Sequence, residues 1–284
     1  MKKICFYHAG CPDGFGAVWA VRGVWGDDGR YIARGHEDHV SLDECEDALV
    51  AFVDIAPGRD ELRDLARIAG QVIVLDHHVT ASNRLFSDAA LVNELEADGH
   101  ELHFELDHSG AVLAWRYFRS EEAMPDLLRY VEDQDLWNWT LPDSDAVNAA
   151  IASYPRDFEA WDRLARESIE ALVEQGKPIL RANQMEVERA LEHARPVALG
   201  TRRIEAVNAT TNRSQIGHQL ARRAQFGESW GLVYRVEGRD VFGTLYSIGD
   251  LDVSKVALEY GGGGHKNASG FRVSLETWLA DFML

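Results

Sequence analysis

Short apolar runs alternate with amphipathic segments through the first half of the chain. The runs are rich in β-branched and aromatic residues, and the segments between them carry apolar positions at helical spacing. Such runs are typical of strands buried on both faces of a parallel sheet. Together the two patterns predict βαβ units and a largely parallel sheet. The strands are expected at residues 3–8, 31–35, 51–57 and 72–75.

The strand at 72–75 is followed directly by Asp76, His77 and His78. In open α/β sheets, ligands bind outside the carboxyl ends of the strands. A single histidine there is more often an ordinary core residue. Two adjacent imidazoles after a carboxylate, at the end of a strand, favour a metal or phosphate site.

Two earlier strands also end in polar residues. His8 closes the first strand, and the Gly- and Pro-containing loop after it carries Asp13 before a helix expected to begin near residues 15–16. Asp54 lies near the end of the strand at 51–57. The strand ends meet at one edge of a parallel sheet, which brings these residues to the His pair. A helix-capping role is the alternative for both acids.

Two further candidates lie between residues 109 and 139. Ser109 precedes an amphipathic run at 112–118, so it is a candidate helix cap, with a phosphate contact as the competing interpretation. Three acidic residues follow within 132–135. They could form an acidic surface turn, but the apolar and aromatic residues on both sides favour carboxylates held near the core.

The second half of the chain changes character twice. Residues 158–195 show helical periodicity broken once at 176–178, which predicts two helices that link two domains. Strand patterns then resume at 204–208, 231–236 and 240–246, and a helix is expected at 253–260. The predicted fold class is α/β, with a mainly parallel-sheet N-terminal domain (1–155), a helical linker (156–195) and a smaller α/β C-terminal domain (196–284).

Four consecutive glycines at 261–264 precede His265 and Lys266. Glycines leave backbone N–H groups uncovered, which suits close approach to a phosphate, and the two side chains add a donor and a positive charge. A flexible linker is the alternative. The candidate substrate-binding residues here are Gly262, Gly263, Gly264, His265 and Lys266.

Composition narrows the class of protein. The chain of 284 residues is 46% hydrophobic and 10% aromatic, which is typical of a folded globular protein of one or two domains. Its apolar runs are far shorter than the roughly 20 residues of a membrane span, and no signal-peptide pattern opens it. Three cysteines without zinc-finger spacing suit a reducing compartment. We therefore expect a cytoplasmic protein with no membrane partner.

The net charge of −18 argues against broad binding to duplex DNA, because that affinity comes from many Lys and Arg contacts. The charge is uneven. From Pro196 onward 10 Lys and Arg face 9 Asp and Glu, whereas the first 195 residues hold 19 against 38. Bound divalent cations reverse the local sign, so an acidic site could still process a short polyanion. Solvated surface charge is the alternative.

The order of these motifs resembles the DHH phosphoesterase superfamily. The similar subgroup carries a DHH-associated C-terminal domain and includes oligoribonucleases and RecJ-like exonucleases. The resemblance covers nearly the whole chain. The residues that carry it are His8, Asp13-Gly14, Asp54, Asp76-His77-His78, Asp133 and Gly261-Gly262-Gly263-Gly264-His265.

This resemblance implies a site with two divalent metal ions, Mn²⁺ first and Mg²⁺ as the alternative. His78 would help to neutralise phosphoryl oxygens, and Asp76 would orient the neighbouring imidazole. The glycines and His265 would hold the far end of a substrate. The implied metal ligands are Asp54 between the ions, His8 on one side, and Asp13, His77 and Asp133 on the other.

Two positions depart from the family pattern. Cys11 stands where the family's first loop usually has an acid. A thiolate binds Mn²⁺ or Zn²⁺ but is a poor ligand for Mg²⁺, so one site could be weak or differently selective. Tyr246 stands where the oligonucleotidases usually have an Arg. A Tyr can stack on a base, but it cannot make a bidentate phosphate contact.

The sequence thus predicts a metal-dependent phosphodiesterase that hydrolyses short single-stranded oligonucleotides or small nucleotides to nucleoside monophosphates. Cyclic-dinucleotide phosphodiesterase and phosphomonoesterase activities are alternatives within the same chemistry. A nucleotide-binding module with weakened catalysis is the alternative of another class, and Cys11 is its support. The oligomeric state stays open, a homodimer included.

Overall fold

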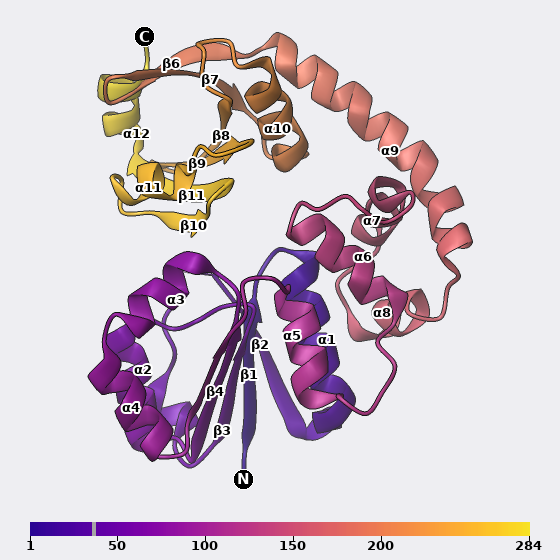
Figure 1. The fold of residues 1–284 in the computed structure, drawn as a ribbon, viewed down its shortest axis with the longest axis vertical. Coiled ribbons are helices and arrows are strands. Elements are labelled where there is room, and N and C mark those ends of the chain that lie inside the picture. The colour runs from indigo at the N-terminus through magenta and orange to yellow at the C-terminus, as the bar shows by residue number, and fades with distance from the viewer. Residues whose placement is uncertain (36–37) are drawn as a thin grey trace. The chain divides into compact units, whose positions relative to one another are not determined.

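A computed structural model describes residues 1–35 and 38–284 (Figure 1). The chain folds as two compact units, Met1–Leu180 and Arg181–Leu284. Each unit contains its own sheet. The three-part division of the sequence, with a linker over 156–195, stays a prediction. The predicted fold class is confirmed: a parallel-sheet α/β region is followed by a second domain with a mixed sheet.

The sheet of the first unit has five parallel strands in the order β2-β1-β3-β4-β5. The four predicted strands are present. The fifth was not predicted, because it is four residues long, partly exposed and lacks a continuous apolar run. The strands are β1 (Lys3–His8), β2 (Gly29–Arg34), β3 (Leu49–Val53), β4 (Gln71–Asp76) and β5 (Glu101–Phe104).

Helices cover both faces of this sheet (Figure 1). Strand alternation divides the core: Ile4 and Phe6 pack into one cluster, and Cys5 packs into the other. The first face carries α2 (Arg59–Ile68), α3 (Val79–Phe86) and α4 (Ala89–Ala97). The second carries α1 (Pro12–Trp25), α5 (Gly110–Phe118), α6 (Asp126–Asp135), α7 (Ser144–Ser153) and α8 (Phe158–Leu164).

Helix α1 begins at Pro12, earlier than the sequence pattern indicated. Proline suits the first helical position, since its φ is already helical and its missing N–H would have no partner there. Cys11 is the N-cap residue, and its Sγ accepts a hydrogen bond from the backbone N–H of Gly14 at 3.2 Å. The loop after β1 therefore turns directly into the helix.

The predicted helix break at 176–178 is wrong. Helix α9 (Ile169–Glu192) continues through Pro178, and the interruption lies at residues 165–168 instead. A Cβ on Gly176 would lie 1.7 Å from the carbonyl oxygen of Ala146. Glycine here lets α9 lie directly against α7, and tertiary packing outweighs the weak local helix propensity of this segment.

The second unit has a six-stranded sheet in the order β10-β11-β9-β8-β7-β6. The pair β7–β8 is parallel and the other pairs are antiparallel. The predicted strands at 204–208, 231–236 and 240–246 are confirmed as β7, β8 and β9. The strands are β6 (Arg195–Leu199), β7 (Arg202–Asn208), β8 (Trp230–Glu237), β9 (Asp240–Ser247), β10 (Gly263–His265) and β11 (Ala268–Ser274), with helices α10 (Arg213–Arg223), α11 (Val253–Leu258) and α12 (Leu275–Thr277).

The glycine-rich segment is ordered structure and not a linker. It forms the hairpin β10–β11, with Lys266 and Asn267 in the turn. A Cβ on Gly262 would lie 2.0 Å from the carbonyl oxygen of Gly270. At least this glycine is therefore required by close backbone packing.

None of the helices in residues 1–35 and 38–284 combines the length and the apolar character that a membrane crossing requires.

The contact between α9 and α7 gives a stability prediction. We expect Gly176→Ala to lower the free energy of unfolding by about 2 kcal/mol, because the new methyl group forces two helix backbones apart. Chemical denaturation measures this change. Gly58→Ala is the control, since a Cβ at Gly58 meets nothing within 4 Å. Equal stabilities of the two variants would contradict the close contact.

Candidate metal centre

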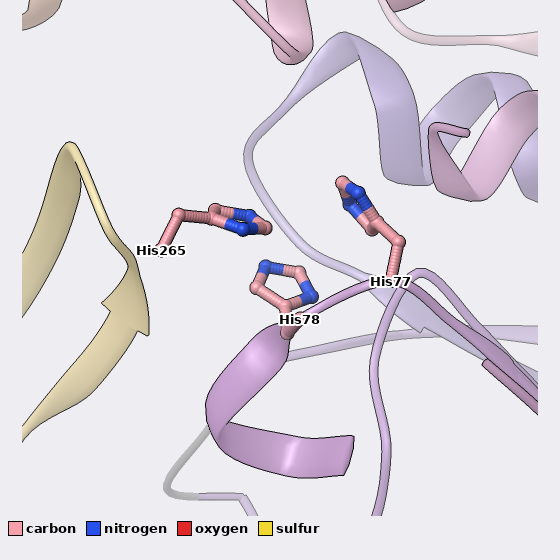
Figure 2. Close-up of side chains that lie close together, drawn as sticks. All are labelled: His77, His78 and His265. Carbon is pink, nitrogen blue, oxygen red and sulfur yellow. The ribbon is translucent and has the colours of Figure 1, made fainter. Parts of the chain in front are cut away.

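The candidate residues gather at the carboxyl edge of the first sheet. The strand order reverses between β1 and β3, and such a switch point is where open α/β sheets bind ligands. His8 ends β1, Asp54 follows β3, and His77 and His78 follow β4. Figure 2 shows the rings of His77 and His78 leaving consecutive positions where β4 gives way to α3; it also labels His265, which belongs to β10 of the second unit.

The backbone of Asp54 is held in a left-handed conformation with φ of 59°. Such a φ is strained for a residue with a side chain, and strain of this kind concentrates at functional sites. The N–H of Asp54 donates to the carbonyl of Leu75 at 2.9 Å. A Cβ on Gly110 would lie 2.4 Å from the Cβ of Asp54, so the start of α5 packs directly against it.

One oxygen of the Asp54 carboxylate faces His8 and Cys11. Asp54 Oδ2 lies 3.3 Å from His8 Nδ1 and 3.4 Å from Cys11 Sγ. Cys11 Sγ is also 3.5 Å from His8 Nδ1. These three groups, called the first donor set below, combine an imidazole, a thiol and a carboxylate.

The other oxygen faces a second donor set, formed by Asp13, His77 and Asp135. His77 Nε2 lies 3.1 Å from Asp54 Oδ1, 3.5 Å from Asp135 Oδ2 and 3.7 Å from Asp13 Oδ2. Asp54 thus contacts both sets, each through a different oxygen.

Asp13 is fixed by the N-terminus of α5. Its carboxylate oxygens accept hydrogen bonds from the backbone N–H groups of Gly110 at 2.7 Å and Ala111 at 3.0 Å. These N–H groups have no partner within the helix, and the helix dipole favours a negative charge there. The fold therefore supports a buried carboxylate at this position.

The charges in the two donor sets strongly perturb one another. Burial raises the pKa of Asp13 well above its usual value, and the charges of Asp54 and Asp135 raise it further. Burial alone would also raise the pKa of Asp54, but hydrogen bonds and charges from His77 and His8 hold it well below its usual value. Burial disfavours a charged His77, yet the hydrogen bond to Asp54 and the neighbouring carboxylates raise its pKa.

This donor chemistry fits divalent cations. Carboxylates, imidazoles and a thiol are the ligand types that bind ions of this class, and a cation would offset the repulsion among three neighbouring carboxylates. Asp76 supplies a further observation. Its Oδ2 is buried and has no hydrogen-bond partner among the residues that the structure describes.

The other oxygen of Asp76 orients His78. Asp76 Oδ1 accepts hydrogen bonds from His78 Nδ1 at 2.7 Å and from the backbone N–H of His77 at 2.7 Å. Burial lowers the pKa of His78, but the charge of Asp76 and this hydrogen bond outweigh it and raise the pKa. Asp76 thus fixes the ring of His78 and favours its protonated form.

Asp133, the acid that the family resemblance implies as a metal ligand, belongs to neither donor set, and that assignment stays a prediction. Both of its carboxylate oxygens accept hydrogen bonds from the following loop: Oδ1 from the backbone N–H and Oγ1 of Thr140, each at 2.9 Å, and Oδ2 from the N–H of Leu141 at 3.4 Å. Asp135 stands in the second donor set instead. Residues two apart point to opposite sides of a helix, so α6 can present only one of these acids to the sheet edge.

Helical spacing gave a signal for this choice. Asp135 follows Val131 by four residues and Leu128 by seven, and both are buried in the core beneath the site. A residue at this spacing lies on the same helix face. The acid run alone carried no information on which carboxylate faces inward.

Ser109, a candidate for either a helix cap or a phosphate contact, is the N-cap residue of α5. Its side chain is buried, and its Oγ accepts a hydrogen bond from the N–H of Val112 at 3.4 Å, as a helix cap does. The capping alternative is thus present in the structure, and the phosphate contact stays a prediction. The predicted substrate-binding residues of the second unit, Gly262, Gly263, Gly264, His265 and Lys266, lie before and along the β10–β11 hairpin.

Tyr246 lies on β9 with its ring against α10. A Cβ on Gly217 would lie 2.0 Å from Cδ2 of this ring, so the helix backbone covers the ring on that side. The ring is therefore partly buried against α10, and the stacking interpretation stays a prediction.

Comparisons with known proteins place the fold. No protein-family model matches the chain. The chain is 25% identical over 292 residues to the uncharacterized protein R106 of Acanthamoeba polyphaga mimivirus, an alignment that covers 95% of the chain and 67% of that protein.

Solved structures with a similar fold include two with a TM-score above 0.5. One is the DHH domain of a member of the s1p family of ribosomal proteins, with a TM-score of 0.57 and 16% identity over 97% of this chain and 83% of that one. The other is an exopolyphosphatase-related protein from Bacteroides fragilis, with a TM-score of 0.51 and 11% identity over 95% and 86%. These likenesses show that the chain has the fold of a DHH-domain protein.

The choice between Asp133 and Asp135 as metal ligand can be tested through metal-dependent stability. An ion that binds the folded state at about 100 times its Kd stabilises that state by about 2.7 kcal/mol. We expect Mn²⁺ to raise the melting temperature of the unaltered chain, and Asp135→Asn to lose most of that increase. Asp133→Asn should lower the melting temperature without metal but keep the increase. The reverse pattern would restore Asp133 as the ligand.

Proposed function

We propose that this chain is a metal-dependent phosphodiesterase that hydrolyses short oligonucleotides or small nucleotides to nucleoside monophosphates. The observation that supports this proposal best is the placement of Asp54, whose two oxygens face two different donor sets. A carboxylate in this position is suited to bridge two divalent ions. The DHH-type fold, which locates the residues at the ligand-binding edge of the sheet, is consistent with it.

The two donor sets would each hold one ion. Asp54 belongs to the first set and would also bind the ion of the second set through its other oxygen. Asp135 takes the place that the family resemblance implies for Asp133. Mn²⁺ is the ion expected first, since it accepts carboxylate, imidazole and thiolate ligands, and Mg²⁺ is the alternative. The ligands would be His8, Cys11 and Asp54 on one side, and Asp54, Asp13, His77 and Asp135 on the other.

When bound, a pair of such ions supplies an activated water nucleophile and neutralises developing negative charge on the phosphoryl group. The chain's own part is to hold the groups in place. The hydrogen bond from Nδ1 to Asp76 orients His78 so that Nε2 would donate to a phosphoryl oxygen. Because Asp76 raises the pKa of His78, the ring would carry a positive charge toward that oxygen.

The substrate class follows from charge. The first unit is strongly acidic, so a long polyanion would be repelled outside the metal site, whereas a short one needs few contacts. The glycine-rich hairpin of the second unit offers backbone N–H groups and the side chains of His265 and Lys266 as candidate contacts to an anionic substrate.

The central test is hydrolysis of a 5′-labelled RNA ladder, from two to about twenty nucleotides, with Mn²⁺, Mg²⁺ or Zn²⁺. We expect metal-dependent cleavage that Asp54→Ala lowers by about three orders of magnitude or more, because this change removes a ligand from both ions. Asp64→Ala is the matched control, since Asp64 is half-exposed on α2 and pairs with Arg67.

The length profile separates a dinucleotide specialist from an enzyme that degrades longer strands. Cleavage that survives in Asp54→Ala would refute the two-ion assignment. Tight nucleotide binding without hydrolysis of RNA, cyclic dinucleotides or phosphomonoesters in any of the metals would refute the enzyme and favour a binding module.

A second prediction concerns Cys11. Thiolate is a poor ligand for Mg²⁺, so Cys11→Asp should raise Mg²⁺-supported activity relative to Zn²⁺-supported activity, by about tenfold in the ratio. Equilibrium dialysis of the metals should show the same shift in affinity. Cys45→Ala, which removes a cysteine from the core, should leave the ratio as it was. An unchanged ratio in Cys11→Asp would place Cys11 outside the metal centre.

A further inference from the structure

Two tryptophans follow Asp135 and stand apart from the core. The sequence holds eight tryptophans, and six of them belong to the hydrophobic clusters of the two units. Among the described residues, Trp137 and Trp139 belong to none of these clusters, and both are partly exposed. The core tryptophans are Trp19, Trp25, Trp115, Trp161, Trp230 and Trp278.

Trp137 occupies a position that normally favours glycine. Helix α6 ends in a Schellman motif: the N–H of Trp137 donates to the carbonyl of Gln134, and the N–H of Asn138 donates to that of Asp133. The residue after the cap then takes a left-handed conformation, and Trp137 has φ of 59°. Trp139 is also left-handed, with φ of 53°. Bulky side chains rarely adopt such backbone angles.

The loop that carries this pair is rigidly held. The carboxylate of Asp133 accepts hydrogen bonds from Thr140 and Leu141, and its carbonyl accepts one from the N–H of Trp139 at 3.3 Å. The two indole rings contact each other edge to face, with centroids 5.1 Å apart. Each ring therefore supports the other outside the core.

The pair is tied to the metal centre through Asp135. The carboxylate of Asp135 lies 3.5 Å from His77 Nε2, and two residues of chain span at most about 7 Å, so the backbone of Trp137 is close to this donor. The strained loop thus begins within two residues of the second donor set and carries two partly exposed indole rings.

We propose that Trp137 and Trp139 form a base-stacking platform that makes the site specific for phosphoesters of nucleosides. This inference rests on the proposed function and narrows its substrate class. Aromatic side chains stack on any base, so the platform would favour nucleotides over inorganic polyphosphate or simple phosphodiesters without selecting one base.

The test compares a dinucleotide with two analogues, each lacking one of its bases. With the unaltered chain, loss of the stacked base should raise KM by about tenfold, a typical effect of stacking one base on an aromatic side chain. The ratio to follow is the KM of the analogue that lacks the stacked base divided by the KM of the dinucleotide. In Trp137→Gly this ratio should fall close to one, and in Trp137→Phe it should stay near its original value. Trp139→Ala and Trp139→Phe should repeat the pattern.

Phe118→Leu is the matched control. Phe118 is also a partly buried aromatic residue, but it lies at the C-terminal end of α5, whereas Asp13 contacts the N-terminal end of that helix. A ratio that persists in both Trp137→Gly and Trp139→Ala would overturn the inference. So would an equal rise of KM for the dinucleotide and both analogues. If Trp137→Gly does not fold, Trp137→Leu compared with Trp137→Phe answers the same question.

The failure of the stacking platform can be distinguished from the failure of the proposed phosphodiesterase activity. Metal- and Asp54-dependent hydrolysis with an unchanged ratio would refute the platform and keep the phosphodiesterase. If the unaltered chain hydrolyses nothing, equilibrium dialysis of the dinucleotide still decides: the platform predicts about tenfold weaker binding by Trp137→Gly, and equal binding would refute it.

Discussion

The buried carboxylate of Asp54 is the constraint around which the first unit is built. A charged group out of water is costly unless hydrogen bonds or opposite charges compensate it. Here a strained left-handed backbone turns the carboxylate between two imidazoles, and β4 holds its N–H. Gly110 leaves room for its side chain. The same contacts that offset the cost of burying this carboxylate also direct its two oxygens to different partners. Oδ2 faces His8, and Oδ1 faces His77.

Helix α5 has a second role in this arrangement. Its N-terminal N–H groups support Asp13, while its apolar face packs in the core with α1. Helix α5 therefore both stabilises the core on this face of the sheet and fixes the position of the Asp13 carboxyl group. Burial and the charges of Asp54 and Asp135 raise the pKa of Asp13, so gathering the three acids at this edge opposes the stability of the charged state, a common trade-off at functional sites.

The end of α6 divides two tasks between neighbouring acids. Asp135 faces the donor set, and Asp133 holds the loop with the two tryptophans. Each task needs a carboxylate in a fixed direction, and the helical rotation between the two residues provides both. The loop then keeps two bulky residues in left-handed conformations that a merely connecting segment would have no reason to maintain.

The sequence by itself indicated four of the five strands of the first sheet, their parallel arrangement and the polar residues that follow three of them, because the period of apolar positions and the geometry of parallel sheets are local properties. It also determined that His8, Asp54 and His77 would meet. The tertiary structure decided that Asp135 lies beside His77, that Ser109 Oγ accepts a helix-capping hydrogen bond and that α9 continues through Pro178. The helical spacing of Asp135 from Val131 and Leu128 was a local signal for its direction. Which face of α6 meets the sheet, and how closely α9 approaches α7, depend on tertiary packing, which the spacing of residues along one segment does not encode.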